Sequence, residues 1–260
     1  DTVDICYFEV YLRKIKQVIG ERPINYLIIN HMEPDHSGSI RLIKQHYPGI
    51  IIVGNKQTFG MIEGFYGVTG EQYLVKEGDF LALGHHKLRF YMTPMVHWPE
   101  TMMTFDETDG VLFSGDGFGC FGTVDGGFLD TRINVDKYWG EMVRYYSNIV
   151  GKYGSPVQKA LQKLGGLPIS AICSTHGPVW TENIAKVIGI YDRLSRYDAD
   201  EGVVIAYGSM YGNTEQMAEA IAEELSAQGV KNIVMHNVTK SHPSYIIADI
   251  FRYKGLIIGS

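Results

Sequence analysis

The segment Asn30-His31-Met32-Glu33-Pro34-Asp35-His36-Ser37-Gly38 constrains the fold and chemistry of this chain more than any other part of the sequence. Four side chains that can bind a metal ion fall within six residues, directly after a short β-rich run. Alternation in an extended loop places His31, Glu33 and Asp35 on one side, and His36 turns in at the next bend. An ordinary polar loop with a helix cap is the alternative, but it requires no such density of ligands. The segment therefore predicts a metal site at the end of a strand.

Three further potential ligands follow later apolar runs, and each lies in a loop that contains Gly or Pro. Such loops are where functional side chains usually lie. Each of the three alone is an ordinary loop residue, so only their combination with the first segment is specific. They are His97 in Met95–Pro99, Asp116 in Phe113–Gly117 and His176 in Cys173–Gly177.

The composition excludes several classes of protein. A length of 260 residues allows one large domain or two ordinary ones, and 45% hydrophobic residues suffice for a core. The net charge of −6, without a basic stripe, argues against a nucleic-acid partner. No apolar run is long enough to span a membrane. Three widely spaced cysteines exclude a disulfide framework and a cysteine metal site, which is consistent with a reducing cytoplasm.

Residues 1–198 mix helical and strand patterns, and we interpret them as one domain. An amphipathic helix follows Asp4, with an apolar face formed by Phe8, Tyr11, Leu12, Ile15, Val18 and Ile19. Further helices are expected over residues 40–46, 138–150 and 182–194. Strands are expected over residues 24–30, 49–54, 110–116 and 169–174, with shorter strand segments between 73 and 93.

A polar stretch at residues 197–202 marks the expected boundary to a second domain, residues 202–260. Strand, helix, strand, helix and strand then alternate, which predicts a parallel sheet with right-handed crossovers. The expected strands are 203–207, 232–237 and 255–259, and the expected helices are 214–227 and 244–251. A doubly wound sheet usually has about five strands, so we expect this domain to continue beyond Ser260.

The loop after the first strand of this sheet carries the residues of an anion site: Ser209, Met210, Tyr211, Gly212, Asn213 and Thr214. Two hydroxyls, a glycine and a helix N-terminus together suit a phosphate group. The spacing is neither GxGxxG nor a Walker motif. The loop resembles the FMN-phosphate loop of flavodoxins, although Thr214 could merely cap a helix.

The ligand pattern resembles the metallo-β-lactamase superfamily, whose signature HxHxDH precedes single His, Asp and His ligands. Glu33 replaces the second histidine here, as in one branch of the superfamily, the flavodiiron proteins. That resemblance implies a metallo-β-lactamase-like αββα sandwich followed by a flavodoxin-like doubly wound parallel sheet. It also implies that the first strands of the family's domain are missing before Asp1.

The resemblance further implies a ligand set for two non-haem irons. A carboxylate in place of an imidazole hardens the set and adds negative charge, which favours iron over zinc. One iron would take His31, Glu33 and His97; the other would take Asp35, His36 and His176; Asp116 would bridge both.

The implied activity is reduction of O2 to water, of NO to nitrous oxide, or of both, with electrons delivered through FMN. A rubredoxin-like protein or a flavin reductase would be the donor, and a head-to-tail homodimer or dimer of dimers is expected. Two alternatives remain open at this point: a dizinc hydrolase of the same superfamily, and an electron carrier without catalytic metals.

Overall fold

The computed structural model describes all residues 1–260, which form two compact units. Each unit is assembled from several stretches of chain, so we describe the units one at a time. The first unit contains Asp1–Gly117, Lys159–Thr175 and Val179–Ile184, and the second contains Phe118–Gln158, His176–Pro178 and Ala185–Ser260.

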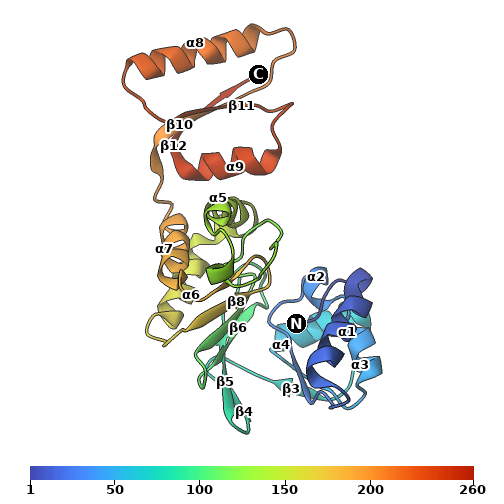
Figure 1. The fold of residues 1–260 in the computed structure, drawn as a ribbon. Coiled ribbons are helices and arrows are strands. Elements are labelled where there is room, and N and C mark those ends of the chain that lie inside the picture. The colour runs from blue at the N-terminus through green and yellow to red at the C-terminus, as the bar shows by residue number, and fades with distance from the viewer. The chain divides into compact units, whose positions relative to one another are not determined.

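The first unit begins with a small parallel sheet of three strands in the order β1-β2-β3. Helices α1, α3 and α4 lie beside this sheet (Figure 1). Their buried side chains, such as Leu12, Ile43 and Ile62, share one core with Leu27 and Ile52 of the strands. The bounds are α1 (Phe8–Ile19), β1 (Tyr26–Ile28), α2 (Pro34–Ser37), α3 (Ile40–His46), β2 (Ile51–Gly54), α4 (Lys56–Tyr66) and β3 (Gln72–Leu74), after a 3-10 turn η1 (Ile5–Tyr7).

A second sheet of six strands follows in the order β4-β5-β6-β7-β8-β9. Neighbouring strands are antiparallel, except that β7 and β8 are parallel. Val53 of β2 and Val75, which directly follows β3, pack in one core with Leu81, Phe90 and Met102 of the larger sheet. The two sheets therefore form a sandwich. The bounds are β4 (Phe80–Leu83), β5 (His86–Met92), β6 (Met102–Asp106), β7 (Val111–Gly115), β8 (Ala171–Ser174) and β9 (Val179–Trp180).

Two expectations for this unit were wrong, and some of its elements were not predicted. Pro34–Ser37 is one helical turn rather than an extended loop, because Pro34 opens the turn and the Ser37 hydroxyl donates to the Met32 carbonyl at 2.7 Å. Val18 is 78% exposed and does not belong to the apolar face of α1. Helix α4 and strand β6 were not predicted; all five residues of β6 are buried, so β6 lacks the alternation typical of a half-buried strand.

The second unit carries helix α5, a π-helical turn η3, helix α7 and a three-stranded parallel sheet in the order β11-β10-β12. Helices α8 and α9 lie on opposite faces of this sheet (Figure 1), as expected for right-handed crossovers. The bounds are α5 (Asp136–Tyr145), η3 (Tyr146–Val150), α7 (Ile184–Ser195), β10 (Asp200–Tyr207), α8 (Asn213–Ala227), β11 (Ile233–Asn237), α9 (Pro243–Arg252) and β12 (Tyr253–Gly259), with 3-10 turns η2 (Asp130–Arg132) and η4 (Gly151–Tyr153). Helix α6 (Gly154–Leu164) links η4 to the strand β8.

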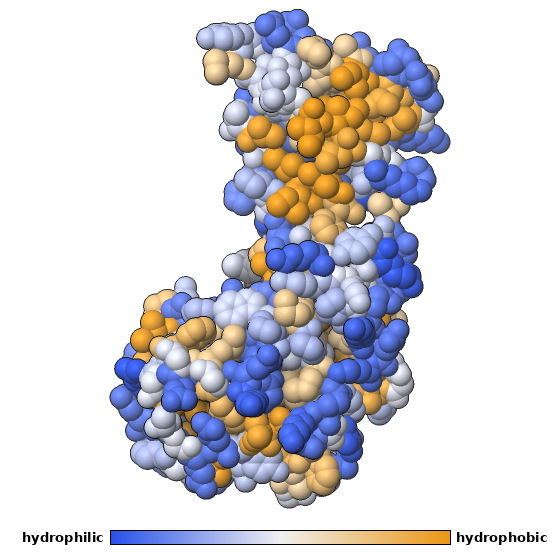
Figure 2. Space-filling view, turned by 180° about the vertical axis from the view of Figure 1, so that it is seen from behind, coloured by the Kyte–Doolittle hydropathy of each residue, from blue (hydrophilic) through white to orange (hydrophobic).

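Helix α9 packs on α5 and η3 within this unit. The guanidinium of Arg144 lies over the ring of Tyr245 at 4.5 Å and donates to the Ser244 hydroxyl at 3.0 Å. Strand β12 pairs only with β10, and its side chains Leu256 and Ile258 are exposed. The apolar surface in Figure 2 is most extensive over this C-terminal sheet. An edge strand of this kind can accept a further strand.

None of the helices combines the length and the apolar character that a membrane-spanning segment requires.

Candidate metal centre and phosphate loop

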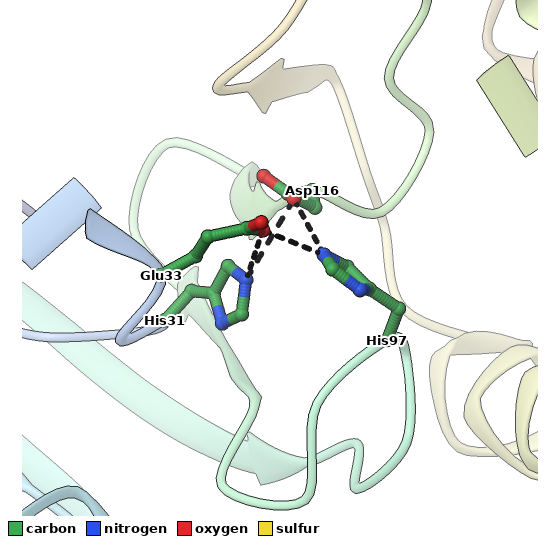
Figure 3. A group of neighbouring side chains, drawn as sticks. All are labelled: His31, Glu33, His97 and Asp116. Carbon is green, nitrogen blue, oxygen red and sulfur yellow. Dashed lines mark hydrogen bonds and ion pairs between the residues drawn. The ribbon is translucent and has the colours of Figure 1, made fainter. Parts of the chain in front are cut away.

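Four of the predicted ligands converge at one edge of the sandwich in the first unit. His31 and Glu33 follow β1, His97 lies in the loop between β5 and β6, and Asp116 directly follows β7. Their side chains point toward one another (Figure 3). One ligand atom of each residue lies within 4.8 Å of the others, which is compact enough to surround one cation.

The individual distances put the two carboxylates between the two imidazoles. Nε2 of His97 lies 3.0 Å from Oδ2 of Asp116 and 3.1 Å from Oε2 of Glu33. Nε2 of His31 lies 3.3 Å from the same Glu33 oxygen and 3.7 Å from Oδ2 of Asp116. His31 and Asp116 are buried, whereas Glu33 is partly exposed, so the group opens toward solvent on the Glu33 side.

Asp116 also faces a second pair of predicted ligands. Its other oxygen, Oδ1, lies 2.9 Å from Nε2 of His36, and that nitrogen is 3.3 Å from Oδ2 of Asp35. Thr175 donates a hydrogen bond to the same Oδ1 at 2.8 Å. One carboxylate therefore presents different oxygens to different histidines, which is the arrangement that a bridging ligand needs.

These contacts shift the pKa values of the groups in the metal-free chain. Burial lowers the pKa of His97, but Asp116 and Glu33 outweigh burial and raise it to about 9. The pKa of His36 also rises to about 9, because Asp116 and Asp35 outweigh burial. His31 and His97 lower the pKa of Glu33 to about 2, and histidines hold that of Asp116 well below its usual range against the effect of burial. In the metal-free chain, His36 and His97 are therefore protonated at neutral pH. A metal cation that binds these nitrogens would displace the protons.

His176 belongs to the second unit, although in the chain it comes two residues after Ser174, the last residue of β8 in the first unit. Its ring centroid lies 5.7 Å from that of Tyr145, and its carbonyl accepts a hydrogen bond from the Cys120 amide at 3.2 Å. Gly177 follows with φ of +89°, a conformation that favours glycine. The place of His176 in a second metal position stays a prediction.

The residues present fit a transition-metal pair. Carboxylate oxygens and imidazole nitrogens are the donors that non-haem iron takes, and zinc accepts the same donors. No thiolate lies in the group, because Cys6 is exposed elsewhere on η1 and Cys120 and Cys173 are in neither set of ligands.

Sequence reasoning missed one buried acid behind this group. Glu100 is fully buried, and its Oε1 lies 2.8 Å from Nδ1 of His31. The available signal was an acidic residue three positions after His97 and two positions before the first residue of β6.

The predicted phosphate loop joins β10 to α8 in the second unit. Ser209 accepts a hydrogen bond from the Glu215 amide at 3.3 Å, and Gly212 takes φ of +87° at the N-cap of α8. Met210 and Tyr211 are each 86% exposed. The loop therefore leaves a helix N-terminus open to solvent beside a hydroxyl, which suits an anion.

Comparison with known proteins identifies the chain. Residues 1–177 match the family described as ODP family beta lactamase, and residues 205–260 match flavodoxin. The flavodiiron protein of Giardia intestinalis superposes with a TM-score of 0.95 at 26% identity, over all of this chain and 64% of that one. The chain belongs to the flavodiiron branch of the ODP β-lactamase family. This confirms the predicted fold class, a metallo-β-lactamase-like domain followed by a flavodoxin-like one.

Other relatives of this flavodiiron chain carry descriptive names. The rubredoxin oxygen:oxidoreductase of Desulfovibrio gigas superposes with a TM-score of 0.95 at 29% identity, over all of this chain and 66% of that one. The anaerobic nitric oxide reductase flavorubredoxin of Vibrio vulnificus is 32% identical over 265 residues, which cover all of this chain and 53% of that protein. The flavodiiron chain thus spans about half the length of the curated relatives it matches.

Proposed function

We propose that this chain is the di-iron and flavin-binding part of an oxidoreductase that reduces NO, O2 or both. One observation carries the proposal: two carboxylates and two imidazoles, from His31, Glu33, His97 and Asp116, place their ligand atoms within 4.8 Å of one another. The names of the relatives from Vibrio vulnificus and Desulfovibrio gigas support the two substrates. The products would be nitrous oxide from NO and water from O2.

The proposal assigns the ligands in two sets around a shared carboxylate. His31, Glu33 and His97 would hold one iron, and Asp35, His36 and His176 would hold the other, with Asp116 between them. Bound iron would supply the one-electron chemistry and the open coordination positions that a diatomic substrate needs.

The chain's own residues set the character of the site. Glu33 in place of an imidazole adds an oxygen donor and a negative charge, which stabilise iron in its +2 and +3 states. Thr175 fixes the orientation of Asp116 by its hydrogen bond to Oδ1. The buried position of His31 excludes water from one side, so a substrate would enter from the side of the partly exposed Glu33.

The second domain would bind FMN through residues 209–214. The hydroxyl of Ser209 and the N-terminus of α8 would hold the phosphate. A rubredoxin-like protein or a flavin reductase would supply the electrons, and a head-to-tail homodimer or dimer of dimers would bring FMN of one chain to the metal site of another.

The test quantifies iron, zinc and FMN in the natively produced full-length protein, followed by anaerobic reduction and separate NO and O2 consumption assays. About two irons per chain and consumption of at least one gas are expected. Zinc together with hydrolysis of a phosphodiester or thioester would establish the dizinc hydrolase instead. FMN without metal, and no consumption of either gas, would identify an electron carrier.

A further inference from the structure

Glu100 is a buried carboxylate whose two oxygens have different surroundings. Oε1 lies 2.8 Å from Nδ1 of His31 and accepts the backbone N–H of Met32 at 2.9 Å. Oε2 is buried and has no hydrogen-bond partner. Because a carboxylate only accepts, the hydrogen between Glu100 and His31 is on Nδ1.

A buried carboxylate with one unsatisfied oxygen costs free energy unless a cation compensates its charge. His31 is the only side chain with a possible positive charge that contacts Oε1. The compensating positive charge must therefore lie on the His31 ring or be bound to it. Nε2, on the opposite side of that ring, faces Oε2 of Glu33 at 3.3 Å and Oδ2 of Asp116 at 3.7 Å. A cation bound at Nε2 would therefore lie beside the carboxylates of Glu33 and Asp116 and would compensate the charge of Glu100 across the imidazole ring.

The backbone of Glu100 is held from a separate element. Asn55 donates to the Glu100 carbonyl at 2.6 Å. The other side-chain atom of Asn55, Oδ1, caps α4 by accepting the amides of Gln57 and Thr58 at 3.0 and 3.1 Å. The position of Glu100 is thus fixed by the start of a helix and does not depend on the metal loops alone.

We propose that Glu100 is a positioning residue for the metal site: it keeps the hydrogen of His31 on Nδ1, directs Nε2 to the cation, and supplies a negative charge behind the ligand. Partners of this kind fix the tautomer of a metal-ligating histidine and make it a stronger donor. A stronger donor stabilises the higher oxidation state, so Glu100 lowers the reduction potential of bound iron. This inference rests on the proposed di-iron function.

The hydrogen-bond pattern allows charge and geometry to be separated. In Glu100→Gln, the amide oxygen can replace Oε1 and keep both hydrogen bonds, while the amide nitrogen replaces Oε2, which has no bond to lose. We expect this variant to bind a full complement of iron with a raised midpoint potential. Glu100→Met has a similar length but no acceptor, so iron affinity should fall about 10- to 100-fold.

Asp249→Asn is the matched control. Asp249 accepts from Nε2 of His236 at 2.8 Å, and this histidine–carboxylate pair belongs to none of the groups that could hold a metal ion. The loss of this negative charge should leave the iron affinity and the midpoint potential unchanged. The potential is the decisive quantity, because a purely structural role of Glu100 would not shift it in a variant that holds its iron.

The outcomes separate this inference from the function on which it rests. Wild-type protein that binds no iron would refute the di-iron function. Wild-type protein that binds iron, with wild-type potential in Glu100→Gln and wild-type affinity in Glu100→Met, would refute the role of Glu100. A lowered iron affinity in Glu100→Met, together with a wild-type potential in Glu100→Gln, would support the role of Glu100 in orienting His31. The same result would refute the effect of its charge on the potential.

A measurement without variants covers the case in which they do not fold. In wild-type protein loaded with diamagnetic zinc, nitrogen-15 NMR should show His31 protonated at Nδ1 and not at Nε2. Protonation at Nε2 would overturn the proposal.

Discussion

Asp116 approaches His97 through a single oxygen: Oδ2 lies 3.0 Å from Nε2 of that histidine. The other oxygen, Oδ1, remains available to His36 at 2.9 Å. Both imidazoles therefore depend on the charge of one buried side chain, and the loss of that charge affects both at once.

Asp116→Asn tests this dependence. The amide has the same shape but no charge, so the two proposed metal positions should lose affinity together, by about 10-fold or more each. Metal content per chain after dialysis against graded chelator measures the effect, with Asp249→Asn as the control. Loss of only one metal would show that Asp116 does not bridge.

Glu33→His restores the HxHxDH pattern of the zinc-binding members of the superfamily. Replacing a hard oxygen donor by an imidazole, and removing one negative charge, should shift the preference from iron toward zinc. Metal content after growth with equal iron and zinc gives the result, with Glu33→Asp as the variant that keeps a carboxylate. An unchanged iron-to-zinc ratio in Glu33→His would contradict the proposed effect of Glu33.

The stability of the metal-free chain should depend on pH. The folded-state pKa values of His36 and His97, about 9, exceed the ordinary value of 6.5. Their contribution is therefore fully present below pH 6.5 and is lost as the pH rises through 9. Glu33, with a pKa of about 2, contributes above pH 4.5 and loses its effect only as the pH falls toward 2.

Denaturant unfolding of the metal-free chain at pH 6, 7.5 and 9 measures this decline. His97→Asn should flatten it, because one of the two raised groups is gone. In the metal-loaded protein the trend should reverse, since protons compete less for Nε2 as the pH rises. A metal-free chain that is equally stable at pH 6 and pH 9 would rule out the charge coupling.

Ser209→Ala tests the phosphate loop. Loss of a hydroxyl from a phosphate site should weaken FMN binding about 10-fold, which corresponds to about 1.4 kcal/mol. Riboflavin lacks the phosphate, so its binding should not change. Ser226→Ala, at the exposed far end of α8, is the control. Equal losses for FMN and riboflavin would place Ser209 away from the phosphate.

The sequence predicted those helices and strands whose ends are set by residues nearby in the chain. Helix α3 has the predicted limits, residues 40–46, and α8 begins one residue before the predicted start at Thr214. The end of β7 was predicted to within one residue, at Asp116 instead of Gly115, whereas β1 ends at Ile28, two residues before the predicted end at Asn30. Spacing and periodicity are local, so one sequence suffices to read them.

Two features of the metal site were not predicted: the buried acid Glu100 and the helical turn at Pro34–Ser37. Glu100 meets His31 across 69 residues, and nothing near either residue specifies that contact. The helical turn at Pro34–Ser37 depends on the Ser37 hydroxyl folding back on Met32, which competes with the extended form that alternation suggested. A contact between residues far apart in the chain decided the first case, and a local hydrogen bond decided the second.

The loops that carry His31, His97 and Asp116 are far apart in the chain and meet only in the folded sandwich. Metal ions held there would act as removable cross-links between loops that no disulfide joins. An unfolded chain cannot offer this set of donors, so metal binding would add directly to the stability of the native state. Chelation should therefore first loosen the loops at this edge, and proteases should cut there before the rest of the sandwich opens.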